Sequence, residues 1–257
     1  MTGLTQCLRV SVVGLLRGTY NSGMSIAENI AAVRERVAAA AARVRRKPED
    51  ITLMAVSKTV EPERIRQAYE AGLRVFGENR VREFEKKAPA LEDLQEAEWH
   101  LIGHLQSNKA KKAAELFNAV DAVDSLHLTQ KLNEAAMQVG KTLPVLIEIK
   151  VSDEASKAGI PVGSPALEEL LQAAAGLDHI QVRGLMTVPP FTENPEGARM
   201  YFRLLRDLRD QIAARKLPRI QMDVLSMGMS HDFEVAIEEG STCVRVGTAI
   251  FGARPRP

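Results

Sequence analysis

The sequence predicts one α/β domain, a closed (β/α)8 barrel of the TIM type with an extra helix before it. Eight short apolar segments alternate with amphipathic segments, which is the pattern of a parallel sheet covered by helices. The chain has 257 residues, and eight such units in this length favour a closed barrel. Because periodicity does not reveal closure, an open doubly wound sheet stays the alternative.

Each expected strand is a short apolar run, and each expected helix repeats apolar residues every three or four positions. The extra helix, 26–46, begins at Ser25 and Glu28, which form the S-x-x-E pattern of a capping box. The expected strands are 51–58, 75–79, 99–103, 119–125, 144–150, 182–188, 222–228 and 243–247. The helices between them are expected at 62–71, 80–95, 107–117, 126–139, 164–175, 195–215 and 233–239.

The composition excludes several classes of protein. Lys and Arg number 34 against 33 acidic residues, so no global charge attracts nucleic acid or an anionic membrane. The chain has no run of about 20 apolar residues that would span a membrane. Two cysteines, Cys7 and Cys243, cannot build a disulfide framework, which fits a reducing compartment. We therefore expect a cytoplasmic protein with neither a nucleic acid nor a membrane as partner.

The first 23 residues differ from the rest of the chain. Their apolar run, 10–16, is short and lies between Arg9 and Arg17, whereas a secretory signal has a longer apolar run and a cleavage site. We expect residues 1–23 to be a disordered extension or an artefact of an upstream start codon. Met24 then opens the barrel domain, which is assigned to 24–257.

Polar residues gather where the expected strands end, which is where barrels of this type carry their active sites. The first strand ends in Ser57 and Lys58. A lysine in a partly desolvated mouth becomes a nucleophilic amine and can form a Schiff base with an aldehyde. The simpler alternative is a solvated lysine that only ends the strand.

The last two strands end in LSMGMS (225–230) and in the segment GSTCVRVGTAIFG (240–252). The loops after the seventh and eighth strands often bind phosphate in barrels. Gly228 and Gly247 let backbone amides approach an anion, although each glycine alone is equally consistent with a tight turn. Together with Lys58, they describe a site for an aldehyde that bears a phosphate, and pyridoxal 5'-phosphate (PLP) has both groups.

Six motifs closely resemble the family of pyridoxal phosphate homeostasis proteins, also called YggS-like proteins. They are AVSKT (55–59), FGEN (76–79), WHLIGHLQSNK (99–109), SDEASKAGI (152–160), RGLMTVP (183–189) and LSMGMSHDFEVAIEEGSTCVRVGTAIFG (225–252). The resemblance covers about residues 24 to 254 and implies a barrel like the N-terminal domain of bacterial alanine racemase. It implies that PLP is held as an internal aldimine on Lys58. It further implies cofactor contacts from Asn79, Ser226, Met227, Gly228, Ser230, Arg245, Gly247 and Thr248, with Arg245 at the ring nitrogen or at the phosphate.

Two classes of function are consistent with such a site. The resemblance implies a protein that buffers PLP or delivers it to PLP-dependent apoenzymes, acts in vitamin B6 homeostasis and turns over no substrate. The alternative is an amino-acid racemase, which needs an acid/base on each face of the substrate Cα. Lys58 serves one face, but the tyrosines, Tyr20, Tyr69 and Tyr201, lie in the leader or on expected helices. The chain ends soon after the last strand, so we expect no second domain to supply the opposing tyrosine.

Three further expectations complete the sequence-based prediction. A phosphosugar-binding barrel with Lys58 as an aldolase-type base is a third reading of the same residues. His100 and His104 have a spacing that suits a metal, but no other ligand is suitably spaced, so we expect no metal site. A closed barrel of this kind is expected to be a monomer.

Overall fold

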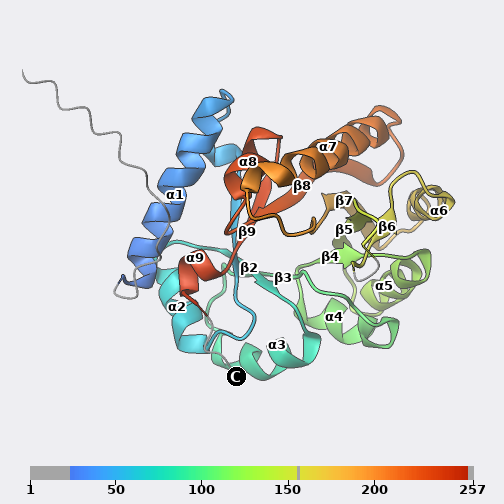
Figure 1. Ribbon diagram of the computed structural model, residues 1–257. Helices are drawn as coiled ribbons and strands as arrows, with labels where there is room; N and C mark the ends of the chain where they lie inside the picture. The colour runs from blue at the N-terminus through green and yellow to red at the C-terminus, as the bar shows by residue number, and fades with distance from the viewer. Residues whose placement is uncertain (1–23, 155–156, 254–257) are drawn as a thin grey trace, which may run out of the picture.

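The computed structural model describes residues 24–154 and 157–253. Eight parallel strands follow one another around a ring, and the ring closes through the β1–β9 and β4–β5 pairings (Figure 1). The closed barrel predicted from the sequence is therefore confirmed, and the open sheet is wrong. The barrel strands are β1 (Thr52–Val56), β2 (Val75–Glu78), β3 (Glu98–Leu101), β4 (Ala119–Val123), β5 (Leu143–Lys150), β7 (Ile180–Met186), β8 (Ile220–Met229) and β9 (Cys243–Val246).

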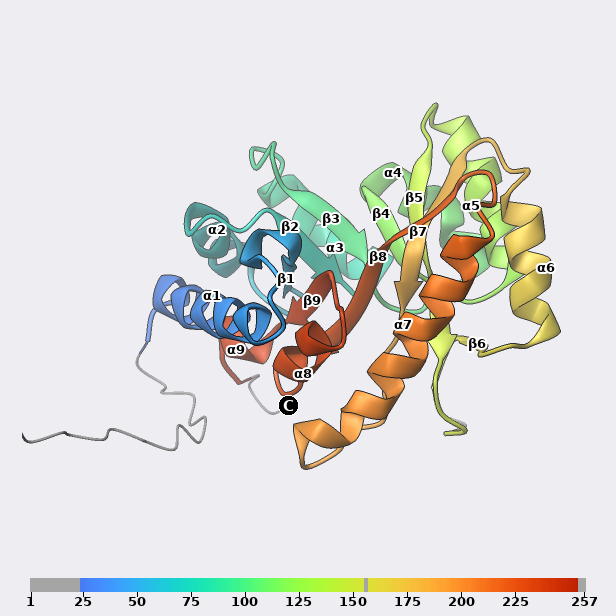
Figure 2. The same cartoon turned by 90° about the horizontal axis from the view of Figure 1, so that it is seen from above.

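Helices surround the strands on the outside of the ring, as the two views show (Figures 1 and 2). The extra first helix is present, and Ser25 and Glu28 form the predicted capping box. The α-helices are α1 (Ile26–Arg43), α2 (Pro62–Glu70), α3 (Val81–Lys87), α4 (Ala110–Leu116), α5 (Leu126–Gln138), α6 (Pro165–Ala174), α7 (Arg199–Ala214), α8 (Phe233–Glu238) and α9 (Thr248–Phe251).

The structure differs from the predicted elements mainly at their ends. The helix expected to reach residue 95 ends at Lys87 and continues as a 3-10 turn over Ala88–Ala90, because Pro89 cannot continue an α-helix. The two-residue strand β6 (Ile160–Pro161) and the four-residue helix α9 were not predicted. Neither is long enough to show a period in the sequence.

The apolar core lies mainly between the sheet and the helices, whereas the inside of the barrel holds a small cluster. Ala122, Leu146 and Met186 form this inner cluster, with Val188 and Val224 packed against it. At Gly184 the neighbouring strand is so close that a Cβ would lie 1.7 Å from the Val224 carbonyl oxygen. Since side chains alternate along a strand, the inward positions beyond this apolar layer carry the polar groups.

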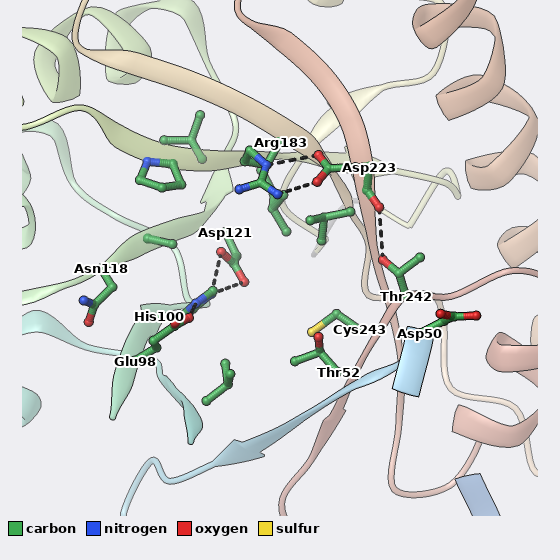
Figure 3. Close-up of a pocket in the computed structure, with 16 residues that line it drawn as sticks. Asp50, Thr52, Glu98, His100, Asn118, Asp121, Arg183, Asp223, Thr242 and Cys243 are labelled. Carbon is green, nitrogen blue, oxygen red and sulfur yellow. Dashed lines mark hydrogen bonds and ion pairs between the residues drawn. The ribbon is translucent and has the colours of Figure 1, made fainter. Parts of the chain in front are cut away.

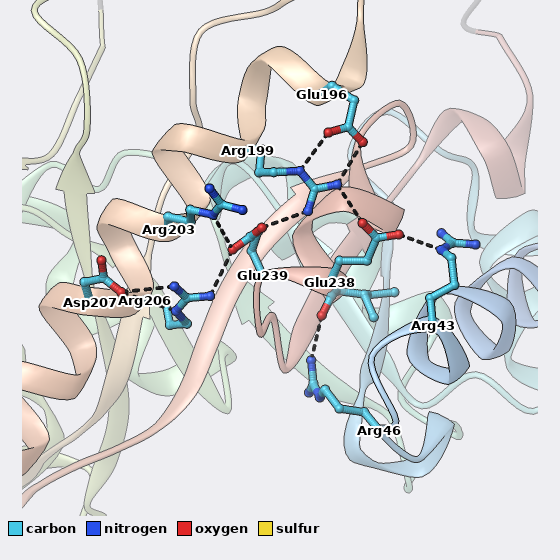
Figure 4. Close-up of polar contacts among 10 residues, drawn as sticks. Arg43, Arg46, Glu196, Arg199, Arg203, Arg206, Asp207, Glu238 and Glu239 are labelled. Atoms are coloured by element: carbon cyan, nitrogen blue, oxygen red, sulfur yellow. Dashed lines mark hydrogen bonds and ion pairs between the residues drawn. The ribbon is translucent and has the colours of Figure 1, made fainter.

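A network of ion pairs fixes α8 between α1 and α7 (Figure 4). The carboxylate of Glu239, which directly follows α8 and is only 5% exposed, accepts hydrogen bonds from Arg199 at 2.8 Å, Arg203 at 3.1 Å and Arg206 at 2.9 Å. Glu238 pairs in turn with Arg199 and with Arg43 of α1, each at 2.6 Å. The network anchors the helix that follows the loop after β8, the loop expected to bind a phosphate.

None of the helices in 24–154 and 157–253 combines the length and the apolar character that a bilayer span requires. The expectation for residues 1–23 lies outside the described residues, and the domain boundary at Met24 stays a prediction.

Candidate functional site

Lys58 lies in the turn directly after β1. Ala55 belongs to the outer core, whereas Met54 and Val56 approach Gly77 and Gly247 on neighbouring strands. Lys58 follows two residues after Val56, in the turn that β1 enters. Its half-buried side chain lines a small cavity together with Gly247 and Thr248. The structure thus brings the predicted nucleophile next to one of the two predicted phosphate loops.

The loops after β8 and β9 are joined by Ser230. Its hydroxyl oxygen accepts hydrogen bonds from the amides of Gly247 at 3.3 Å and Ala249 at 3.4 Å. Gly228 has φ +94°, and a Cβ there would lie 2.6 Å from the Cβ of Ala236, so the position requires glycine. Ser230 therefore links the loop after β8 to the loop after β9.

Arg245 is buried inside the barrel. It lies on β9, two residues before Gly247. Its guanidinium donates to the Ser226 carbonyl at 2.8 Å, to the Ser226 hydroxyl at 2.6 Å and to the Thr187 carbonyl at 2.7 Å. These partners are neutral oxygens. Burial lowers the pKa of Arg245, but a guanidinium stays protonated in proteins. The inside of the barrel therefore holds a fixed positive charge close to the glycine loops.

Two predicted residues lie apart from this arrangement. Asn79 is half-buried at the end of β2 and lines a different cavity, together with His104 and Lys109. Its main chain is held close to Gly103, where a Cβ would lie 2.4 Å from the Asn79 carbonyl oxygen. Met227 is fully buried in the core between the sheet and the helices.

Other polar residues at this end of the barrel were not predicted. Asp232, which follows the loop after β8, accepts a hydrogen bond from the Met229 amide at 2.6 Å and so shapes that loop. Burial raises the pKa of Asp232. Glu148 is also buried, and burial followed by repulsion from Asp124 raises its pKa against the attraction of Arg245. Alternation along 144–150 was the signal that could have placed Glu148 inside the barrel.

A larger cavity of about 660 Å³ lies at the opposite end of the barrel, where the strands begin (Figure 3). Four of its charged side chains form two pairs: His100 Nδ1 lies 3.1 Å from Asp121, and Arg183 forms an ion pair with Asp223. His104 is bound instead to Asp124 at 2.9 Å. Within the described part of the chain, no group of three His, Cys, Asp or Glu side chains is arranged to hold a metal.

Comparison with known proteins identifies the family of the chain. The sequence pattern of the family described as "Alanine racemase, N-terminal domain" matches residues 28–255. The pyridoxal phosphate homeostasis proteins of Aquifex aeolicus and Escherichia coli K12 are 45% and 44% identical to the chain. These matches cover 90% and 89% of the chain and 99% and 97% of the two relatives.

Solved structures give the same result. PipY of Synechococcus elongatus with PLP bound superposes with a TM-score of 0.78 at 36% identity, over 89% of this chain and all of PipY. Alanine racemase of Corynebacterium glutamicum superposes with a TM-score of 0.68 at 18% identity, which shows a shared fold. That match covers 90% of this chain and 61% of the racemase. The chain belongs to the family of pyridoxal phosphate homeostasis proteins, built on the alanine racemase N-terminal domain fold.

Proposed function

We propose that this chain binds PLP covalently through Lys58, and that it buffers or delivers the cofactor in vitamin B6 homeostasis without turning over a substrate. The observation that carries the proposal is the cavity shared by Lys58, Gly247 and Thr248, which sets an amine beside a glycine loop. PLP supplies an aldehyde that condenses with an amine, with loss of water. The relatives named for pyridoxal phosphate homeostasis, and the PLP bound in PipY, support the assignment.

The residues present fit the two ends of PLP. Ser230 accepts a hydrogen bond from the Gly247 amide and so joins the loops after β8 and β9, and the hydroxyl groups of Ser230 and Thr248 would contact a phosphate there. Arg245 lies within β9, whereas Gly247 lies in the loop after that strand. We therefore assign Arg245 to the pyridine ring rather than to the phosphate. A guanidinium beside the ring nitrogen keeps that nitrogen unprotonated, which weakens the ring as an electron sink. This arrangement holds PLP firmly while disfavouring carbanion chemistry.

A carrier is favoured over a racemase by what lies around Lys58. Racemisation needs a second acid/base group opposite the lysine. Within the described residues, the tyrosines Tyr69 and Tyr201 lie on α2 and α7, outside the barrel. We further propose that the chain acts as a cytoplasmic monomer, and that PLP-dependent apoenzymes are the recipients.

The proposal is tested by separating binding from turnover. Protein reconstituted with PLP should absorb near the blue edge of the visible, and mixing with an excess of a PLP-dependent apoenzyme should restore that enzyme's activity. In deuterated water, the PLP-loaded protein should not exchange the Cα proton of any common amino acid, as followed by NMR. Rapid exchange with one amino acid would identify an enzyme instead, and absence of the absorption band would favour the phosphosugar-binding alternative.

A further inference from the structure

The main chain on both sides of Lys58 is tied to α3. On one side, the Ser57 carbonyl accepts a hydrogen bond from Lys87 Nζ at 3.0 Å, and the Ser57 hydroxyl donates to Glu78 Oε1 at 2.7 Å. On the other side, the Thr59 amide donates to Glu83 Oε1 at 2.5 Å. The two residues that flank the proposed covalent lysine are therefore held by one set of side chains.

Lys87 is the centre of this set. Its ammonium lies 2.8 Å from Glu78 Oε1 and 3.0 Å from Glu83 Oε1, in addition to its bond to Ser57. An ammonium has three donors, and all three are used here. The side chain of Lys87 is 11% exposed and that of Glu78 is fully buried, so water screens these contacts little.

The network also holds an unfavourable backbone conformation. Thr59 has φ +60°, a left-handed conformation that a β-branched residue rarely adopts. Such conformations persist only where the surroundings hold them, and they gather at functional sites. Here the bond from the Thr59 amide to Glu83 fixes it. Burial opposes ionisation of Glu83, but the bonds from Thr59 and Lys87 outweigh it and lower the pKa of that carboxyl.

We propose that Lys87, acting with Glu78 and Glu83, is the positioning group that sets where the Lys58 amine can reach. This inference rests on the proposed role of Lys58 in holding PLP. The contacts of Lys87 end on the residue before Lys58 and, through Glu83, on the residue after it. Losing them frees the turn at Thr59, so that the covalent bond between Lys58 and PLP becomes easier for an outside amine to attack.

The test compares the full-length, PLP-loaded protein with K87M and with a matched control, K131M. Lys131 also pairs with a glutamate, Glu134 at 2.8 Å, but on the exposed surface of α5. The readout is the rate at which hydroxylamine removes PLP, well below the unfolding temperature. We expect about a tenfold faster release from K87M, which corresponds to loss of one charge-assisted hydrogen bond, and no change for K131M. Restoring a cation with K87R should recover most of the slow release, because an arginine can again pair with Glu78 and Glu83.

A second variant, E83Q, separates the proposed effect on Lys58 from misfolding. Because K87M removes the cation beside the buried carboxylate of Glu78, E83Q is measured beside it. E83Q keeps the bond between Lys87 and Glu78 and weakens the contacts that Thr59 and Lys87 make with residue 83. Faster release from E83Q supports the inference, and release at the wild-type rate from both K87M and E83Q overturns it. PLP attached to another lysine in the wild-type protein would overturn the proposed function, and the inference with it. PLP on Lys58 with unchanged release rates would overturn the inference alone.

Discussion

The pair formed by His100 and Asp121 at the strand-start end of the barrel should make stability depend on pH. Burial opposes the charge on His100, but attraction and hydrogen bonding from Asp121 and Glu98 outweigh it and raise the histidine's pKa from 6.5 to about 10. A pKa that is higher in the folded state means that protonation stabilises the fold. The contribution is complete below about pH 6.5 and is lost as the pH rises through about 10.

The size of this contribution follows from the gap between the two pKa values. Each unit corresponds to about 1.36 kcal/mol, so a shift from 6.5 to about 10 sets an upper limit near 5 kcal/mol. His100 lines a cavity of about 660 Å³ and keeps 20% of its side chain exposed, so water screens the pair. We therefore expect about half of the limit, roughly 2 to 3 kcal/mol, as the coupling between His100 and Asp121.

A double-mutant cycle of H100Q and D121N measures this coupling. Urea unfolding at about pH 6 should give the full coupling energy, and at about pH 10.5 it should give less than half. The ion pair of Arg183 and Asp223 in the same cavity is the control, because arginine stays charged and its coupling should not change between the two pH values. Equal coupling between His100 and Asp121 at both pH values would refute the reasoning.

Three further predictions follow from the site and its support. G228A should destabilise the fold by about 2 to 3 kcal/mol in thermal unfolding, because the residue has φ +94° and its Cβ would lie 2.6 Å from that of Ala236. The control G163A should lose less, about 1 kcal/mol, because a Cβ at Gly163 meets nothing within 4 Å. R245K should weaken PLP binding at least about tenfold in a fluorescence titration, because an ammonium cannot replace three guanidinium bonds to Ser226 and Thr187; unchanged affinity would remove Arg245 from the site. E239Q should lower the unfolding free energy by about 2 kcal/mol, because it weakens the ion pairs of residue 239 with three arginines of α7. The PLP stoichiometry should stay at the wild-type value. A loss of PLP binding would show that α8 is coupled to the site.

Much of the fold could be read from the sequence because its signals are local. The capping box at Ser25 and Glu28 and the eight apolar runs needed only neighbouring residues to be recognised. Closure is a property of pairing between distant strands, such as Thr52 with Cys243, and only the structure shows it. Element ends were predicted least well, as at Pro89, where a 3-10 turn follows the helix.

Candidate site residues could be predicted from the sequence where a reactive or flexible residue stands next to the end of an apolar strand. Lys58 follows β1 and Gly247 follows the neighbouring strand β9, so the barrel brings these two residues to one cavity. The residues that hold them in place were not predictable in the same way. Lys87 and Asp232 lie on or beside helices, and their partners, the carbonyl of Ser57 and the amide of Met229, are main-chain groups that leave no mark in a sequence pattern.

The central claim is that Lys58 forms the covalent bond to PLP, and one measurement tests it most directly. The wild-type protein, loaded with PLP, is reduced with borohydride, digested and analysed by mass spectrometry, with the absorption spectrum taken before and after reduction. The account predicts loss of the visible band and a single modified peptide, with the PLP mass on Lys58. A modification found on any other lysine, or none at all, would contradict it.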